Sequence, residues 1–221
     1  IYVSIPWAVS IHTVTAFLYA GLPGRGFWLS AIMAPRFLGS AFASGPSFLI
    51  LICLFLRKYT KFDAGWEAIQ SLAKIITYAL IISVFFVLCE LFTVFYSQIP
   101  EHMHHFTYLF VGLHGHYGLV AWMWTAIILA AIALIIMINP KTRNNPSTLA
   151  IGCGATFLAL WIEKGITLVL TGYIPSPLET ITEYHPTVPE IAIVIGVWAL
   201  GLLILSILYK VALGVKEEVA A

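Results

Sequence analysis

The chain has 221 residues, of which 61% are hydrophobic and only 10% are charged, and its mean hydropathy is +0.96. A soluble domain of this size does not need so much apolar surface, so the composition indicates an integral membrane protein and excludes soluble enzymes. The net charge of +1 argues against nucleic acid as a partner, and the sequence holds neither a Gly-rich phosphate loop nor a dinucleotide fingerprint.

Six apolar stretches are long enough to cross a bilayer as helices. They cover residues 1–20, 36–56, 70–98, 117–138, 148–172 and 190–213. The segments between them are short and contain Pro, Gly or charged residues, which interrupt helices. We therefore expect an all-α membrane protein with about six transmembrane helices. The chain begins with Ile1, and we expect it to be part of a longer protein.

The first two stretches carry different signals. His12, Thr15 and Tyr19 share one face of the first helix, and His12 alone suits a structural or a functional role equally. In the second stretch, small residues recur every four positions up to Gly45-Pro46, which predicts close helix contact and a kink. Such a kink suits a pocket and simple packing about equally.

Glu90 and Glu163 lie deep in the third and fifth stretches, and Lys164 follows directly. Ionisable groups at this depth are costly to insert, so they usually face the protein interior and mark a proton, ion or substrate path. We expect both carboxylates to be functional. Lys164 would hold Glu163 ionised or bind another helix, because adjacent helical residues point about 100° apart.

The basic residues indicate the orientation of the bundle. Eight of the eleven share one side: Arg57, Lys58, Lys61, Lys74, Lys141, Arg143, Lys210 and Lys216. By the positive-inside rule that side is cytoplasmic, together with the C-terminus. The opposite loops hold most of the acidic and imidazole groups, namely Glu101, His102, His104, His105, Glu179, Glu183, His185 and Glu190.

Counting from the external helix ends places His12, Glu90 and Glu163 roughly 12–14 Å deep, in the external half of the membrane. His114 and His116 stand at the external mouth of the fourth helix. A mono-haem cytochrome b is therefore one alternative, because these histidines could ligate at most one haem. A proton- or ion-coupled transporter is another, and it ranks first on the residues alone. Cys53, Cys89 and Cys153 lie singly and predict no metal site.

Several motifs occur in a characteristic order. They are His12-Thr13-Val14, Gly26-Phe27-Trp28-Leu29, Ala34-Pro35-Arg36-Phe37, Trp161-Ile162-Glu163-Lys164 and Tyr184-His185-Pro186-Thr187-Val188-Pro189-Glu190. Together they resemble the NrfD/polysulfide reductase membrane-subunit family, in which Arg is more usual than Lys after the Glu. Within the family, the run from His12 to Arg25 looks most like the membrane subunit of the sulfate-reducer Dsr transmembrane complex, with the Hmc-type subunit next.

The resemblance implies two four-helix bundles in a prokaryotic cell membrane, without haem or iron–sulfur clusters of their own. Residues 1–57 would supply the last two helices of a quinone-site bundle, and residues 58–221 a second bundle with external loops 99–116 and 173–190. The chain would be a quinone-interacting subunit of an oxidoreductase complex rather than a complete enzyme. It would exchange electrons between quinone, expected to be menaquinone, and an extracytoplasmic partner in anaerobic sulfur respiration.

The implied partners are a ferredoxin-like iron–sulfur subunit, other membrane subunits and, as a further candidate, a multihaem cytochrome c. We expect the external loops 21–36, 99–116 and 173–190 to dock the extracytoplasmic partner.

A quinol pocket needs an apolar slot, a partner for each ring oxygen and an exit for protons. His12 can take a quinol proton near neutral pH, and Phe17, Tyr19 and Trp28 can line the slot. The expected proton path consists of Glu90, His116, Glu163 and Lys164.

Overall fold

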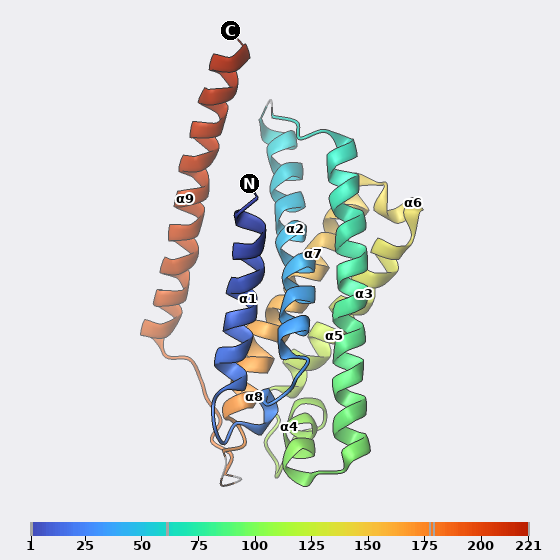
Figure 1. Ribbon diagram of the computed structural model, residues 1–221, viewed down its shortest axis with the longest axis vertical. Helices are drawn as coiled ribbons and strands as arrows, with labels where there is room; N and C mark the ends of the chain where they lie inside the picture. The colour runs from blue at the N-terminus through green and yellow to red at the C-terminus, as the bar shows by residue number, and fades with distance from the viewer. Residues whose placement is uncertain (1, 61, 177, 179, 221) are drawn as a thin grey trace. The chain divides into compact units, whose positions relative to one another are not determined.

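A computed structural model describes residues 2–60, 62–176, 178 and 180–220 (Figure 1). Every extended regular element in these ranges is a helix, and Leu113 and His116 form an isolated β-bridge. The all-α prediction is therefore confirmed. The chain divides into two units, Ile1–Glu183 and Tyr184–Ala221, which are described separately below. Lys61, Glu179 and the side chain of Lys216, which were counted in the charge pattern above, lie outside the described part.

The first half of the chain forms α1 (Ser4–Ala20), the 3-10 turn η1 (Gly26–Trp28), α2 (Met33–Tyr59) and α3 (Trp66–Ser97). Helix α2 carries Pro35 in its first turn, where a missing backbone donor costs little, and it continues through Pro46. Arg57 and Lys58 in its last turn complement the negative end of the helix dipole.

Proline marks the start of the next short elements. It opens α4 (Pro100–Phe110), α6 (Pro140–Arg143) and α7 (Pro146–Trp161), because its ring suits the first helical position. Asn139 and Asn145 cap the latter two by accepting backbone N–H groups. Helix α4 lies within the predicted loop 99–116, which is thus partly helical. Helix α5 spans Val120–Ile138.

Helix α7 runs without a break into the π-helical turn η2 (Ile162–Leu168) and α8 (Val169–Tyr173). In the second unit, α9 spans Val188–Ala220. At its start the Glu190 carboxylate accepts both the backbone N–H and the hydroxyl of Thr187, at 2.6 and 2.7 Å, and the first of these bonds is one half of a capping box.

Among the described residues, five helical segments are long and apolar enough to cross a membrane. They are Met33–Tyr59, Trp66–Ser97, Val120–Ile138, Pro146–Tyr173 and Val188–Val215. Helix α1 matches the first of the six predicted stretches, but with 17 residues it is shorter than the others. The structure therefore agrees with a multi-pass membrane protein.

Helix α2 packs along α1, α3 and α7, and α5 packs along α7 and α3. The small residues of α2 permit this contact: a Cβ atom built at Gly39 would lie 3.7 Å from the Ser83 backbone of α3. Ser40 and Ala43 on the same helix are buried. The predicted small-residue motif thus serves close packing between neighbouring helices.

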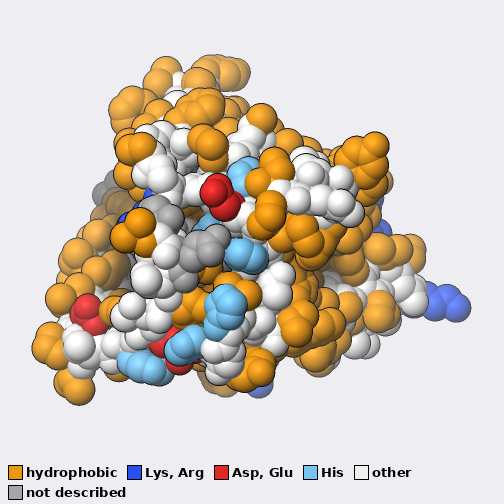
Figure 2. All heavy atoms as spheres, turned by 90° about the horizontal axis from the view of Figure 1, so that it is seen from below, with side chains coloured by type: hydrophobic (Ala, Val, Ile, Leu, Met, Phe, Trp, Pro, Cys, Tyr) orange, Lys and Arg blue, Asp and Glu red, His pale blue; other side chains and the backbone are white. Residues whose placement is uncertain are grey.

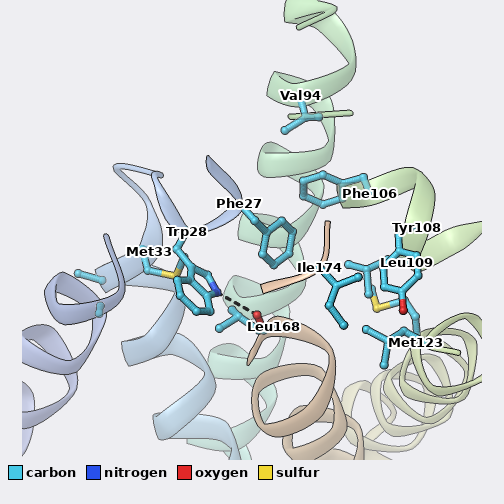
Figure 3. Close-up of a cluster of buried hydrophobic side chains, with 13 residues drawn as sticks. Phe27, Trp28, Met33, Val94, Phe106, Tyr108, Leu109, Met123, Leu168 and Ile174 are labelled. Atoms are coloured by element: carbon cyan, nitrogen blue, oxygen red, sulfur yellow. Dashed lines mark hydrogen bonds between the residues drawn. The ribbon is translucent and has the colours of Figure 1, made fainter. Parts of the chain in front are cut away.

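A hydrophobic cluster closes the end of the first unit where α4 lies (Figure 3). One of its members is Trp28, whose ring is fully buried and whose Nε1 donates to the Leu168 carbonyl at 2.9 Å. A Cβ atom at Gly172 would lie 1.8 Å from the Trp28 ring, so only glycine leaves room for it. Through this contact the η1 turn before α2 packs against α8, at the end of the predicted stretch 148–172.

The two ends of the first unit differ in charge. The end formed by α4 and the neighbouring loops carries Glu101, His102, His104, His105, His114 and His116, and we call it the histidine-rich end. Figure 2 looks onto this face, where His and acidic side chains gather among hydrophobic ones. Arg57, Lys58, Lys141 and Arg143 lie at the opposite end, near the turn after α2 and near α6 (Figure 1).

Candidate functional site

Three buried ionisable side chains and one partly buried lysine meet between α2, α3 and η2. Arg36, in the first turn of α2, pairs through Nη1 with Glu90 of α3 and through Nη2 with Glu163 of η2. Lys164 Nζ lies 2.9 Å from Glu163 Oε2 and 3.0 Å from Oε1. Arg36 is 4% exposed, Glu90 6% and Glu163 7%. We call Arg36, Glu90, Glu163 and Lys164 the ion-pair quartet.

The quartet contains two cations and two carboxylates, so it is neutral when all four groups are ionised. Each charge alone would cost several kcal/mol to bury, and mutual pairing offsets much of that cost. Glu163 and Lys164 are in direct contact although adjacent helical residues point about 100° apart, and this contact is the one that the first of the two expected roles of Lys164 requires. The four-carbon stem of Lys164 is flexible enough to fold its ammonium back onto the adjacent carboxylate.

A cavity of about 380 Å³ opens beside the quartet between α1, α2 and the α7–η2–α8 segment. Its polar side chains include His12 and Tyr19 from α1 and Lys164 from η2, while Phe37 and Trp161 contribute ring surfaces. Lys164 Nζ also lies 5.6 Å from the centre of the Phe37 ring. This volume suits a ring-sized ligand, and we call it the His12 cavity.

A second cavity, of about 330 Å³, borders the quartet at Glu90. Glu90 and Thr93 of α3 line it together with His102 and Phe106 of α4, and we call it the Glu90 cavity. His102 also borders a third cavity of about 400 Å³ at the histidine-rich end, lined by Arg25, Glu101, His104 and His105 among others. We call this one the terminal cavity.

A fourth cavity, of about 250 Å³ and almost wholly apolar, lies between α3, α5 and α7. Leu88 is one of its aliphatic lining residues, and Glu163 and Ser83 are its polar ones. Glu163 therefore borders this apolar space as well as belonging to the quartet.

Some of the site residues predicted from the sequence line a cavity or belong to the quartet, and others do not. His12, Tyr19 and Lys164 line one cavity, and Glu90 and Glu163 belong to the adjoining quartet. Phe17 is 62% exposed and outside the His12 cavity, because five residues of helix turn it about 140° away from His12. Trp28 lies behind Tyr19, with ring centres 4.8 Å apart, and is held in the core by its bond to Leu168.

His116, which was predicted to belong to the proton path, also lies away from the cavities. Its Nδ1 lies 3.6 Å from Glu183 Oε1, and the side chain is 40% exposed at the surface. It lines none of the four cavities described above. The ordered loop from His114 to Gly118 holds it at the surface, since the Glu183 carboxylate also accepts the Gly118 backbone N–H at 3.1 Å.

Two further residues belong to the site, although they were not predicted as site residues from the sequence. Arg36 was named only within the Ala34-Pro35-Arg36-Phe37 motif. The signal that could have found it is helical phase, because Ser40, Ala43 and Ser47 follow it on the same buried face of α2. His102 was one of several loop histidines, and only the packing of α4 against the η1 loop brings it to the Glu90 cavity.

Histidines within α4 differ in environment. Burial lowers the pKa of His105, which is 9% exposed and lies 5.5 Å from the Phe27 ring, so this imidazole is neutral at pH 7. His102 and His104 are more accessible. Among the described residues, no group of three or more His, Cys, Asp or Glu is placed to hold a metal ion.

Comparison with known families decides the class of this protein. Residues 1–177 match the family model described as polysulphide reductase, NrfD. The chain belongs to the NrfD family. The family prediction is thereby confirmed, whereas the likeness to the Dsr-type subunit stays a prediction.

Two curated relatives are similar to this NrfD-family chain. One is a putative membrane subunit of dimethyl sulfoxide reductase from Halobacterium salinarum, 27% identical over 91% of this chain and 50% of that protein. The other is the Hdr-like menaquinol oxidoreductase integral membrane subunit of Archaeoglobus fulgidus, 28% identical over 96% of this chain and 56% of that protein. The chain thus spans about half the length of these relatives.

Proposed function

We propose that this chain is a quinol-interacting membrane subunit of an oxidoreductase complex, and that the His12 cavity receives the quinol ring. The observation that carries the proposal is the convergence of an imidazole, a phenol and an ammonium group on one cavity beside a buried ion-pair quartet. The names of the two relatives, both membrane subunits of oxidoreductases, support the same class.

The chemistry of quinol oxidation matches these groups. Oxidation to quinone removes two electrons and two protons, so each ring hydroxyl needs a neighbouring acceptor. The His12 imidazole can accept the proton of one hydroxyl. The proton of the other can pass to Glu163 through Lys164, whose ammonium gives a proton to the carboxylate that it contacts and takes one from the hydroxyl. The rings of Phe37 and Trp161 supply apolar walls that exclude water from the reacting ring.

The proposal also covers the type of quinol, the partner that takes the electrons and the orientation in the membrane. The quinol is menaquinol, as in the name of the Archaeoglobus fulgidus relative. Electrons pass to an iron–sulfur ferredoxin-like subunit docked on the histidine-rich end, which faces outward from a prokaryotic cytoplasmic membrane, with the C-terminus inside. A multihaem cytochrome c is a further partner. A Dsr-type role in sulfur respiration, and the grouping of residues 1–57 with a first bundle, follow from the family resemblance.

The test is the substitution His12→Ala in the assembled complex. We expect menadiol oxidation to fall at least tenfold, because a positioned general base contributes about 10²–10⁴-fold to proton transfer. Ser10→Ala on the same helix is the matched control, since Ser10 is exposed and about 200° from His12 around the helix axis. Full activity in His12→Ala, at equal amounts of complex, would remove this cavity from the reaction.

A further inference from the structure

We propose that protons released in the His12 cavity leave through the Glu90 cavity, with His102 as the last acceptor before solvent. This outlet rests on the proposed quinol site. Each quinol that becomes quinone gives two electrons to the one-electron acceptor of the partner subunit, an iron–sulfur or haem group, and two protons to the outlet. The ion pairs of the quartet connect Lys164 of the His12 cavity with Glu90 of the Glu90 cavity, and His102 lines both the Glu90 cavity and the terminal cavity.

The first step leads from the His12 cavity into the quartet. Lys164 lines that cavity, and its ammonium contacts both carboxylate oxygens of Glu163. The Lys164 ammonium can give one proton to the Glu163 carboxylate and take the quinol proton in its place, so that one proton enters the quartet. Phe37 and Leu160 also line the cavity and offer no proton acceptor.

The second step passes between two carboxylates. One guanidinium, that of Arg36, contacts both Glu163 and Glu90, so the two acids lie within a guanidinium's width of each other. Arg36 cannot give up its own proton at physiological pH. The quartet carries one excess positive charge while the proton is on either acid, and Arg36 stays paired with the carboxylate that remains ionised as the proton passes from Glu163 to Glu90.

The third step leads from Glu90 to the histidine-rich end. Glu90 and His102 line the same cavity, and His102 also borders the terminal cavity. The charged and titratable groups around His102 are Glu90 from α3, Arg25 from the loop before η1, and Glu101, His104 and His105 from α4. Of the three histidines that line the terminal cavity, His102 is the one that also lines the Glu90 cavity.

The first experiment measures water access and needs no turnover. In a variant of the complex with Cys53, Cys89 and Cys153 replaced by Ala, Thr93→Cys should react with a membrane-impermeant cationic methanethiosulfonate added to native membrane vesicles. Thr93 lines the Glu90 cavity, whereas Leu88, on the same helix, lines the apolar cavity. Leu88→Cys, the matched control, should not react. If Thr93→Cys were as unreactive toward the methanethiosulfonate as Leu88→Cys, the outlet would be overturned.

The second experiment separates the outlet from the quinol site. His102→Ala should slow menadiol oxidation about tenfold while the binding of a menaquinone analogue is unchanged, and added imidazole should restore the rate. His104→Ala on the same helix is the control for partner docking, since His104 lines the terminal cavity but not the Glu90 cavity.

The outcomes for the two proposals differ. A normal rate in His102→Ala, with a slow rate in His12→Ala, would overturn the outlet and leave the quinol site standing. A normal rate in His12→Ala would instead overturn the proposed function. A slow His102→Ala complex that imidazole does not restore would also count against proton transfer, because a purely structural role would give that result.

Discussion

Single residues determine how charge is kept inside this bundle. Arg36 is buried because two carboxylates from different helices, Glu90 and Glu163, pair with it, and Lys164 balances the second carboxylate. The sequence was sufficient to predict that Glu90 and Glu163 face the interior, since their insertion cost implies it. It was insufficient to predict their common partner, because pairing between α2, α3 and η2 depends on where three distant segments pack.

The quartet predicts the outcome of a charge-removal series. Glu163→Gln leaves Arg36 and Lys164 facing only Glu90, and an uncompensated buried charge costs about 3–5 kcal/mol. We therefore expect less of this variant in the membrane. The double change Glu163→Gln with Lys164→Met restores neutrality, so its level should recover while quinol oxidation stays impaired. Immunoblots of membranes and menadiol turnover measure the two effects.

Thr167→Val is the control for this series, because its hydroxyl bonds only to the Glu163 backbone carbonyl, at 2.8 Å. Its level and turnover should stay near those of the parent. Parental turnover in the double variant would remove Glu163 and Lys164 from the reaction. A double variant as scarce as Glu163→Gln would show that charge balance does not determine the level.

At the scale of elements, the long helices could be predicted from the length of their apolar stretches, whereas the short elements α4 and η2 could not. The spans from α2 to α9 could be predicted because each holds about 20 apolar residues. Helix α4, with 11 residues, has no span-length apolar run and was taken as loop. The π-helical turn η2 has no composition signal of its own, yet it places Glu163 and Lys164 between two cavities.

The contact between η1 and α8 provides an element-scale prediction. Gly172→Ala would place a methyl group 1.8 Å from the Trp28 ring, so the ring or the helix must shift. We expect a loss of about 1–3 kcal/mol in stability, as for other overpacked cores, and a lower melting temperature in detergent. Gly154→Ala, in the same helical segment, meets nothing within 4 Å and should not lower the melting temperature. Equal melting temperatures for the two variants would contradict the packing of Trp28.

At the scale of the whole molecule, basic residues concentrate at one end of the first unit, and the terminal cavity lies at the other. Basic residues gather near α6 and the end of α2, whereas the terminal cavity and the histidines lie around α4 (Figures 1 and 2). The charge asymmetry could be read from the sequence with the positive-inside rule. The route from His12 to His102 could not, because it runs through side chains from α1, α2, α3, α4 and η2 that have no shared sequence pattern.

The central claim is that quinol binds in the His12 cavity, and photolabelling of the assembled complex tests it most directly. A menaquinone analogue with an azide on its ring is bound, illuminated and mapped by peptide mass spectrometry, with excess menaquinol as competitor. We predict competed labels within residues 12–19 and 157–169, the segments that hold the lining residues of this cavity from α1 and from α7–η2–α8. Competed labels confined to α3 and α5 around the apolar cavity, or to other subunits, would contradict the account.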